Sequence, residues 1–202
     1  IAFFFYIDGV YTIIDMATAY GSALGLDSTG LLLALLVTQL VAFPSAIIFG
    51  KLAKRFNTEK LILVCISAYL FIAIFAIFLA TQLQFWILAV LVGMFQGGVQ
   101  ALSRSYFAKI IPAEQAGEYF GLMDICGKGA AFLGTLVVGV VTQITGSMSK
   151  GVGMISVFFV IGIVFFNMAM KADSTCKVHA KKKRHNEEPV ENMGAAINIL
   201  LT

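Results

Sequence analysis

Long uninterrupted apolar runs constrain the fold of this chain more than any other feature. Runs of about 20 residues, long enough for an α-helix to cross a bilayer, follow one another with short polar turns between them. The runs are continuous and do not alternate between apolar and polar residues, which argues against a β-barrel. With 59% hydrophobic and 12% charged residues, a soluble domain is also excluded. The sequence therefore predicts an all-α membrane protein with six transmembrane helices, over residues 1–24, 31–50, 61–83, 85–107, 119–144 and 152–170.

A polar stripe runs along the first predicted helix. Asp8 and Asp15 are seven residues apart and therefore share one helix face, with Tyr11 and Thr12 between them. A charge at the centre of a membrane helix costs about 2.5–3.5 kcal/mol on insertion scales, so this face should line a bundle interior or a water-filled path. We interpret the stripe as a site for a solute or a proton. The alternative is a structural pair satisfied by hydroxyl groups or by other helices.

Further polar side chains lie within or at the ends of the fourth and fifth predicted helices. Gln96 and Gln100 follow one stripe and either bind a solute or join helices through hydrogen bonds. Arg104, at the end of the same helix, either reaches the lipid headgroups or has a gating role. Asp124 and Lys128 are four residues apart, so they can pair within one helix, as a structural pair or as part of a gate.

Three features bear on how the helices pack. Gly93 and Gly97 form a GxxxG pattern, which permits close contact between helices. Pro44 interrupts the second predicted helix and predicts a kink. The third predicted helix, residues 61–83, is almost wholly apolar, and we expect it to face lipid.

The cysteines and histidines indicate no metal or haem site. Cys65, Cys126 and Cys176 stand at unrelated positions, and two of them lie inside predicted helices as small apolar side chains. His179 and His185 belong to the polar C-terminal segment. We expect the protein to carry no cofactor.

The cations predict the orientation in the membrane. If the loop 51–60 lies in the cytoplasm, only Lys150 among the loop cations faces the other side. The cations on the cytoplasmic side are Lys51, Lys54, Arg55, Lys60, Arg104, Lys109 and the six between Lys171 and Arg184. Residues 171–202 are then a basic cytoplasmic tail without fixed structure. The net charge of +3 reflects topology and anionic lipid headgroups and does not indicate a nucleic-acid partner.

The loop after the second predicted helix resembles a motif of the major facilitator superfamily, where it recurs at the same place in each six-helix half. The stretch begins Gly50-Lys51-Leu52-Ala53-Lys54-Arg55-Phe56. Lys54 stands where an acidic residue is usual in that motif, and Asn57 stands where glycine is usual.

Three further stretches resemble the vacuole-effluxer-like branch of that superfamily, the autophagy-related amino-acid exporters and their bacterial relatives. Residues 6–17 resemble its seventh helix, residues 96–112 its tenth helix and the loop that follows, and residues 118–134 its eleventh helix. Thr135 stands where that branch is expected to have proline. The resemblance extends over residues 1–170.

The resemblance implies that the chain is the C-terminal half, helices seven to twelve, of a twelve-helix transporter. The first apolar run is already under way at Ile1, so we expect a fragment whose N-terminal six-helix half is missing. The implied function is secondary-active transport of small, amino-acid-like solutes by alternating access. The implied location is the cell (inner) membrane, or the vacuolar membrane in a eukaryote.

Two other functional classes are considered. An intramembrane aspartyl enzyme is disfavoured, because a shared-proton dyad needs its carboxyl groups about 3 Å apart. Seven helical residues separate Asp8 from Asp15 by about 10 Å along the axis. A non-transporting assembly or receptor subunit remains the alternative.

A last expectation concerns energy coupling. We expect at least one of the two aspartates, Asp8 and Asp15, to exchange a proton during transport. Asp15 is the stronger candidate, because Thr12 and Met16 leave less room for water around it than Gly9 leaves around Asp8.

Overall fold

The computed structural model describes residues 2–171, which are helical apart from short turns. The chain divides into two compact units, residues 1–166 and 167–202, and the described part of the second, residues 167–171, is helical. The elements in order are α1 (Ala2–Ala23), α2 (Ser28–Leu52), α3 (Thr58–Ile77), α4 (Gln82–Ile110), the short 3-10 helix η1 (Ala113–Gln115), α5 (Ala116–Thr145) and α6 (Met148–Gly153). Helical structure resumes after a turn at Met154, so the last apolar helical segment is Met148–Lys171.

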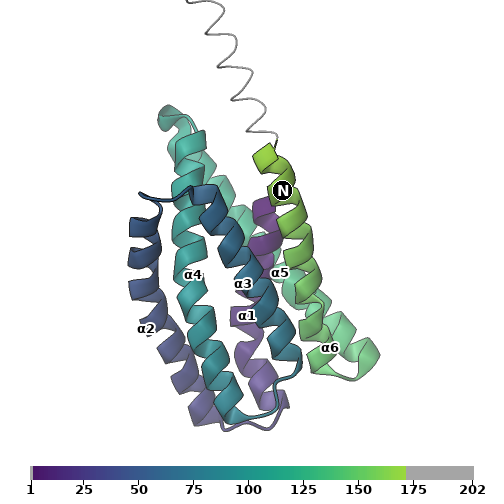
Figure 1. The fold of residues 1–202 in the computed structure, drawn as a ribbon. Helices are drawn as coiled ribbons and strands as arrows, with labels where there is room; N and C mark the ends of the chain where they lie inside the picture. The colour runs from purple at the N-terminus through teal and green to yellow at the C-terminus, as the bar shows by residue number, and fades with distance from the viewer. Residues whose placement is uncertain (1, 172–202) are drawn as a thin grey trace, which may run out of the picture. The chain divides into compact units, whose positions relative to one another are not determined.

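The predicted fold class is confirmed. Six helical segments among the described residues are long and apolar enough to cross a membrane. Within residues 1–166 the helices lie side by side, with the connecting turns at the two ends of the bundle (Figure 1). The predicted tail, including Cys176 and the Lys181–Arg184 run, lies outside the described residues.

Local sequence signals fix several helix ends. Asp27 caps α2, where its carboxylate accepts a hydrogen bond of 2.7 Å from the backbone N–H of Gly30. Thr81 and Gln84 form a capping box at the start of α4. Gly146 ends α5 with a φ of 65°, a left-handed conformation that favours glycine.

Helices α2 and α4 pack through small residues, as the GxxxG pattern predicts. A side-chain carbon added at Gly93 would lie 2.6 Å from the Thr38 carbonyl oxygen, and one added at Gly97 would overlap the Ala42 carbonyl oxygen. The Thr38 hydroxyl donates to the carbonyls of Ala34, at 2.9 Å, and Ala89, at 3.2 Å. The two backbones are therefore close enough for side chain–backbone hydrogen bonds. Helix α2 continues through Pro44, so the proline does not end it.

The expectation that the third helix simply faces lipid is wrong. One face of α3 is fully buried, with Ile62, Ile66 and Tyr69 inaccessible to solvent, and it packs against α4 and α6. The opposite face, which includes Phe71, is exposed. Because nearly every residue of α3 is apolar, its sequence carries no periodic signal that would separate the two faces.

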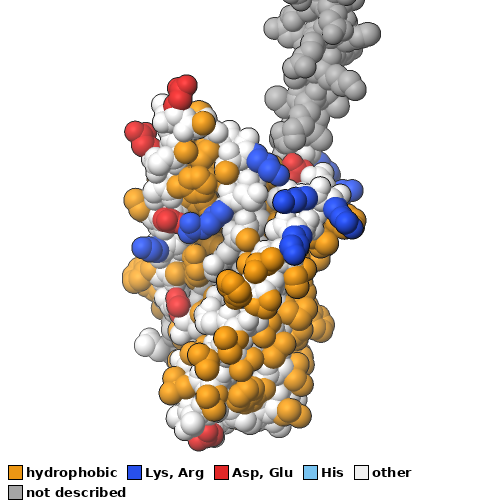
Figure 2. Space-filling view, turned by 90° about the vertical axis from the view of Figure 1, so that its left-hand side faces the viewer, with side chains coloured by type: hydrophobic (Ala, Val, Ile, Leu, Met, Phe, Trp, Pro, Cys, Tyr) orange, Lys and Arg blue, Asp and Glu red, His pale blue; other side chains and the backbone are white. Residues whose placement is uncertain are grey.

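The surface combines a wide apolar band with basic side chains toward one end. Figure 2 shows hydrophobic side chains over most of the face in view and Lys and Arg side chains gathered near one end of it. Large apolar side chains such as Leu36, Phe43 and Leu133 are exposed, as expected for a surface in contact with lipid. The C-terminus of α2, the N-terminus of α3 and the C-terminus of α4 meet at one end because these helices are consecutive and antiparallel.

The close α2–α4 contact predicts a position-specific effect of glycine substitution. Gly97→Ala should destabilise the folded full-length protein by about 1–3 kcal/mol, since the added methyl group meets backbone atoms that cannot move aside without separating the helices. Gly139→Ala in α5 is the matched control, because nothing lies within 4 Å of the added carbon. Unfolding in detergent measures both, and equal stability of the two variants would contradict the packing described.

Candidate functional site

A groove of about 380 Å³ lies between α2 and α4. Its polar lining residues are Gln39 from α2 and Gln96, Gln100 and Arg104 from α4. Small residues, among them Ala42, Ala46 and Gly97, also line it. The volume falls in the range of small-molecule sites in proteins. The three polar residues predicted on α4 thus line one groove, together with an amide that the prediction did not include.

Gln96, which lines this groove, has an unsatisfied buried group. The side chain is 8% exposed, and its Oε1 atom has no hydrogen-bond partner among the described residues. A buried polar atom without a partner costs about 1–3 kcal/mol.

A second, much smaller cavity of about 10 Å³ lies between α1, α4 and α5. Its polar lining residues are Tyr11, Gln100, Arg104 and Asp124. The space is close to that of a single water molecule. Because Gln100 and Arg104 also line the groove, polar groups from four helices converge on this part of α4.

Arg104 and Asp124 form an ion pair between α4 and α5. Nη2 of the guanidinium lies 2.8 Å from Oδ1 of the carboxylate, and the side chains are 54% and 51% exposed. The expected pair between Asp124 and Lys128 is therefore wrong, because the carboxylate points to α4 and Lys128 lies exposed on α5. Arg104 binds the carboxylate of Asp124, a partner that its interpretation as a lipid-headgroup contact did not include.

Asp8 joins α1 to α5. Its side chain is 1% exposed, and Oδ1 accepts hydrogen bonds from the backbone N–H of Gly134, at 2.9 Å, and from the Thr12 hydroxyl, at 3.4 Å. Glycine at position 134 is necessary for this contact, because a side-chain carbon there would overlap Asp8 and Thr12. Asp8 and Thr12 are therefore engaged between helices, away from the groove.

Asp15 has a different environment, although it shares a helix face with Asp8. It is exposed, whereas Asp8 is buried. The expectation that Asp15 is the more enclosed of the two is wrong. Helix α5 covers the shared face at Gly134, beside Asp8, and leaves it open near Asp15.

Comparison with known proteins places the chain in a family. The family profile described as "Vacuole effluxer Atg22 like" matches residues 1–177. The chain belongs to this family. The resemblance stated from the sequence is confirmed, and the polar groove and the Asp8 contact are features of this member.

Named relatives come from bacteria and fungi. The chain is 50% identical over 175 residues to "Uncharacterized MFS-type transporter YxiO" of Bacillus subtilis (strain 168), covering 87% of the chain and 41% of that relative. It is 26% identical over 180 residues to "Autophagy-related protein 22" of Cryptococcus neoformans, covering 81% of the chain and 32% of the relative. The protein of that name from Vanderwaltozyma polyspora is 25% identical over 180 residues, covering 83% and 35%. The chain therefore spans less than half the length of these relatives.

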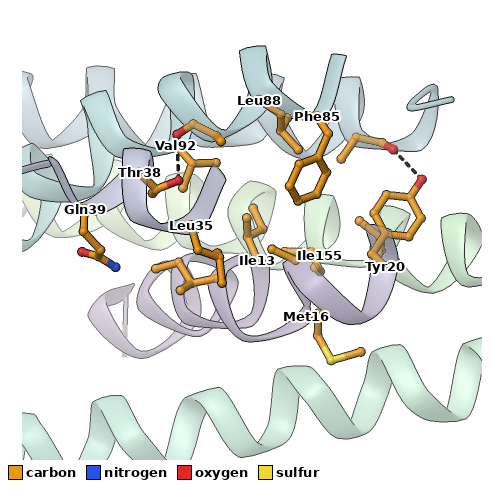
Figure 3. Close-up of a pocket in the computed structure, with 15 residues that line it drawn as sticks. Ile13, Met16, Tyr20, Leu35, Thr38, Gln39, Phe85, Leu88, Val92 and Ile155 are labelled. Carbon is orange, nitrogen blue, oxygen red and sulfur yellow. Dashed lines mark hydrogen bonds between the residues drawn. The ribbon is translucent and has the colours of Figure 1, made fainter. Parts of the chain in front are cut away.

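This member of the vacuole effluxer family also has an apolar cavity of about 50 Å³ between α1, α2, α3, α4 and the last helical segment, Met148–Lys171. Figure 3 shows Gln39 at one end of it and Tyr20 at the other, with Ile13, Leu35 and Ile155 between them. The Tyr20 hydroxyl donates to the Ala76 carbonyl at 2.7 Å. Since Gln39 lines both spaces, the apolar cavity and the polar groove adjoin at this residue.

Two residues of these sites were missed from sequence. Gln39 is a lone amide in an apolar helix, which is the same signal that identified Gln96 and Gln100. Gly134 gave no signal, because its role depends on α1 crossing α5 at that point. The loop motif Gly50–Arg55 lies at the C-terminal end of α2 and lines neither the groove nor the small cavity. Among residues 2–171, no three His, Cys, Asp or Glu residues are placed to hold a metal ion.

Proposed function

We propose that this chain forms one six-helix half of a secondary transporter and that the groove between α2 and α4 binds its solute. The observation that carries the proposal is the groove itself, in which three amides and a guanidinium group converge within otherwise apolar helices. Polar side chains at membrane depth are costly and typically line solute paths. The names of the relatives, an MFS-type transporter and Autophagy-related protein 22, support the same assignment.

The lining chemistry favours a small amino-acid-like solute. Arg104 offers N–H donors to a carboxylate, and the amides of Gln39 and Gln100, which are not fully buried, offer oxygen atoms that accept from an ammonium group. The apolar cavity beyond Gln39 provides a hydrophobic environment for an uncharged side chain. An amino acid with an apolar side chain combines these three properties.

Alternating access requires a second half. Asp15, Gln39 and Arg104 are exposed in this chain, and lipid would not satisfy such side chains. A further six-helix half facing α1, α2, α4 and α5 would enclose them, with the solute between the halves. The chain spans 41% of its Bacillus relative, so that relative is long enough to contain such a second half.

The cations favour an orientation with the loop 51–60 and the C-terminus in the cytoplasm. The membrane is the cell membrane in a bacterium or the vacuolar membrane in a eukaryote.

In intact cells, an impermeant thiol reagent should fail to reach Cys176 from outside. Labelling of Cys176 from outside would reverse the orientation.

Transport can be tested with the full-length protein reconstituted in liposomes, with radiolabelled L-leucine as the solute. Gln96→Leu and Gln100→Leu should each raise the KM for uptake about tenfold, because each removes a polar group from the groove. Gln143→Leu is the matched control, since Gln143 is an exposed amide on α5 that does not line the groove.

Equal KM values for the groove variants and the Gln143 control would contradict the assignment of the site. Binding of L-leucine without flux into the liposomes would instead favour the alternative, a non-transporting receptor or assembly subunit.

Coupling to protons is the second part of the proposal. Asp8 is bound to Gly134 and Thr12, so a change of its protonation state would disturb the α1–α5 contact. Asp15 is exposed and can change protonation without breaking that contact. With a pH-sensitive dye inside the liposomes, Asp15→Asn should abolish L-leucine-driven proton movement and preserve leucine exchange. Proton movement that persists in both Asp15→Asn and Asp8→Asn would end the coupling proposal.

A further inference from the structure

The ion pair at the mouth of the small cavity uses only part of its bonding capacity. The ion pair joins one guanidinium nitrogen of Arg104 to one carboxylate oxygen of Asp124. A guanidinium group carries five N–H donors and can bind a carboxylate through two parallel bonds. Arg104 is therefore held in place by Asp124 and still has donors for a second anion.

Because the Arg104–Asp124 pair is exposed, another carboxylate can readily replace Asp124 as the partner of Arg104. Each side chain is about half exposed in this chain, and an ion pair that water from a solute path reaches contributes little net stability, since water and salt screen the attraction. A carboxylate that offers Arg104 two bonds in a less hydrated position can replace a single bond to Asp124. Asp124 would lose little, because water can solvate its half-exposed carboxylate.

Arg104 lies between the groove and the small cavity. It lines the groove between α2 and α4, and it also lines the small cavity that contains Asp124. Gln100 borders the same two spaces one helical turn away. A solute in the groove and the carboxylate on α5 therefore approach Arg104 from different sides.

We propose that Arg104 is the residue that recognises the carboxylate of the solute and that Asp124 is its counter-ion in the empty site, released when the solute binds. This inference rests on the proposed function of the groove and adds the specificity-determining residue. Exchange of one carboxylate for another keeps the charge of Arg104 neutralised in both states. It also removes the ion pair between α4 and α5, which links solute occupancy to the contact between these helices.

The test measures the reactivity of Arg104 toward phenylglyoxal in the full-length protein in nanodiscs, by mass spectrometry of the peptide that contains it. L-leucine and L-leucinamide are the two probes, because they share the ammonium group and the side chain and differ at the carboxylate. We expect L-leucine to slow the modification of Arg104 and L-leucinamide at the same concentration to leave it unchanged. Asp124→Asn should speed the modification in the empty protein and strengthen protection by L-leucine about tenfold, since the competing carboxylate is gone.

The controls separate this effect from general changes in structure. Arg55 is an exposed arginine that lines neither the groove nor the small cavity, and its modification should not respond to either probe. Lys150→Gln removes a charge far along the chain from the pair and should leave the reactivity of Arg104 unchanged. Arg104→Gln should bind the two probes equally in a competition assay, whereas Arg104→Lys should keep part of the preference for L-leucine.

The outcomes distinguish this inference from the proposed function. Uptake of L-leucine by the wild-type protein without selective protection of Arg104 would overturn the inference and leave transport standing. Selective protection without uptake would support the inference and contradict transport. Protection by phosphatidylglycerol in the nanodisc, with no effect of L-leucine, would assign Arg104 to the lipid headgroups and overturn the inference.

Discussion

Each polar group within a membrane-length helix must find a partner, and this constraint determines how the described helices are arranged. Apolar packing alone does not distinguish one helix pair from another in lipid, whereas a buried carboxylate allows few arrangements. Asp8 gains its one hydrogen bond from another helix where Gly134 of α5 brings its backbone N–H to 2.9 Å. Thr38, which already donates to Ala34 within α2, also reaches the Ala89 carbonyl where α4 approaches. The polar contacts thus determine which helices lie next to each other, and apolar packing adds to the contact between them.

Small residues make these contacts possible, and the candidate site follows from them. Gly93 and Gly97 bring the backbone of α4 against α2, and Gly134 brings α5 against α1. The groove lies beside the contact between α2 and Gly97, and Gln96 and Gln100 of α4 line it. The close packing and the candidate solute site are therefore found on the same glycine-rich segment.

The sequence predicts the features that depend on local pattern. Six apolar runs predicted the helices, and the four-residue spacing of Gln96 and Gln100 predicted the stripe that lines the groove, whereas Arg104 was interpreted as a headgroup contact or a gating residue. It does not predict features that depend on which helix approaches which. Asp124 pairs with Arg104, 20 residues away, because α5 passes the end of α4 at that point. The burial of Asp8, the exposure of Asp15 and the buried face of α3 likewise depend on neighbouring helices, and no periodicity within a single helix shows them.

The central claim is that the groove face of α2 is open to water while the neighbouring exposed face lies against apolar surroundings. Gln39 and Leu40 are adjacent and at nearly the same depth, and they point about 100° apart around the helix. The most direct measurement is the reaction of Gln39→Cys and Leu40→Cys with an impermeant thiol reagent, in the full-length protein with its other cysteines replaced. The account predicts that Gln39→Cys is labelled, that L-leucine slows its labelling, and that Leu40→Cys stays unlabelled. Equal labelling of both positions, or labelling of Leu40→Cys alone, would contradict it.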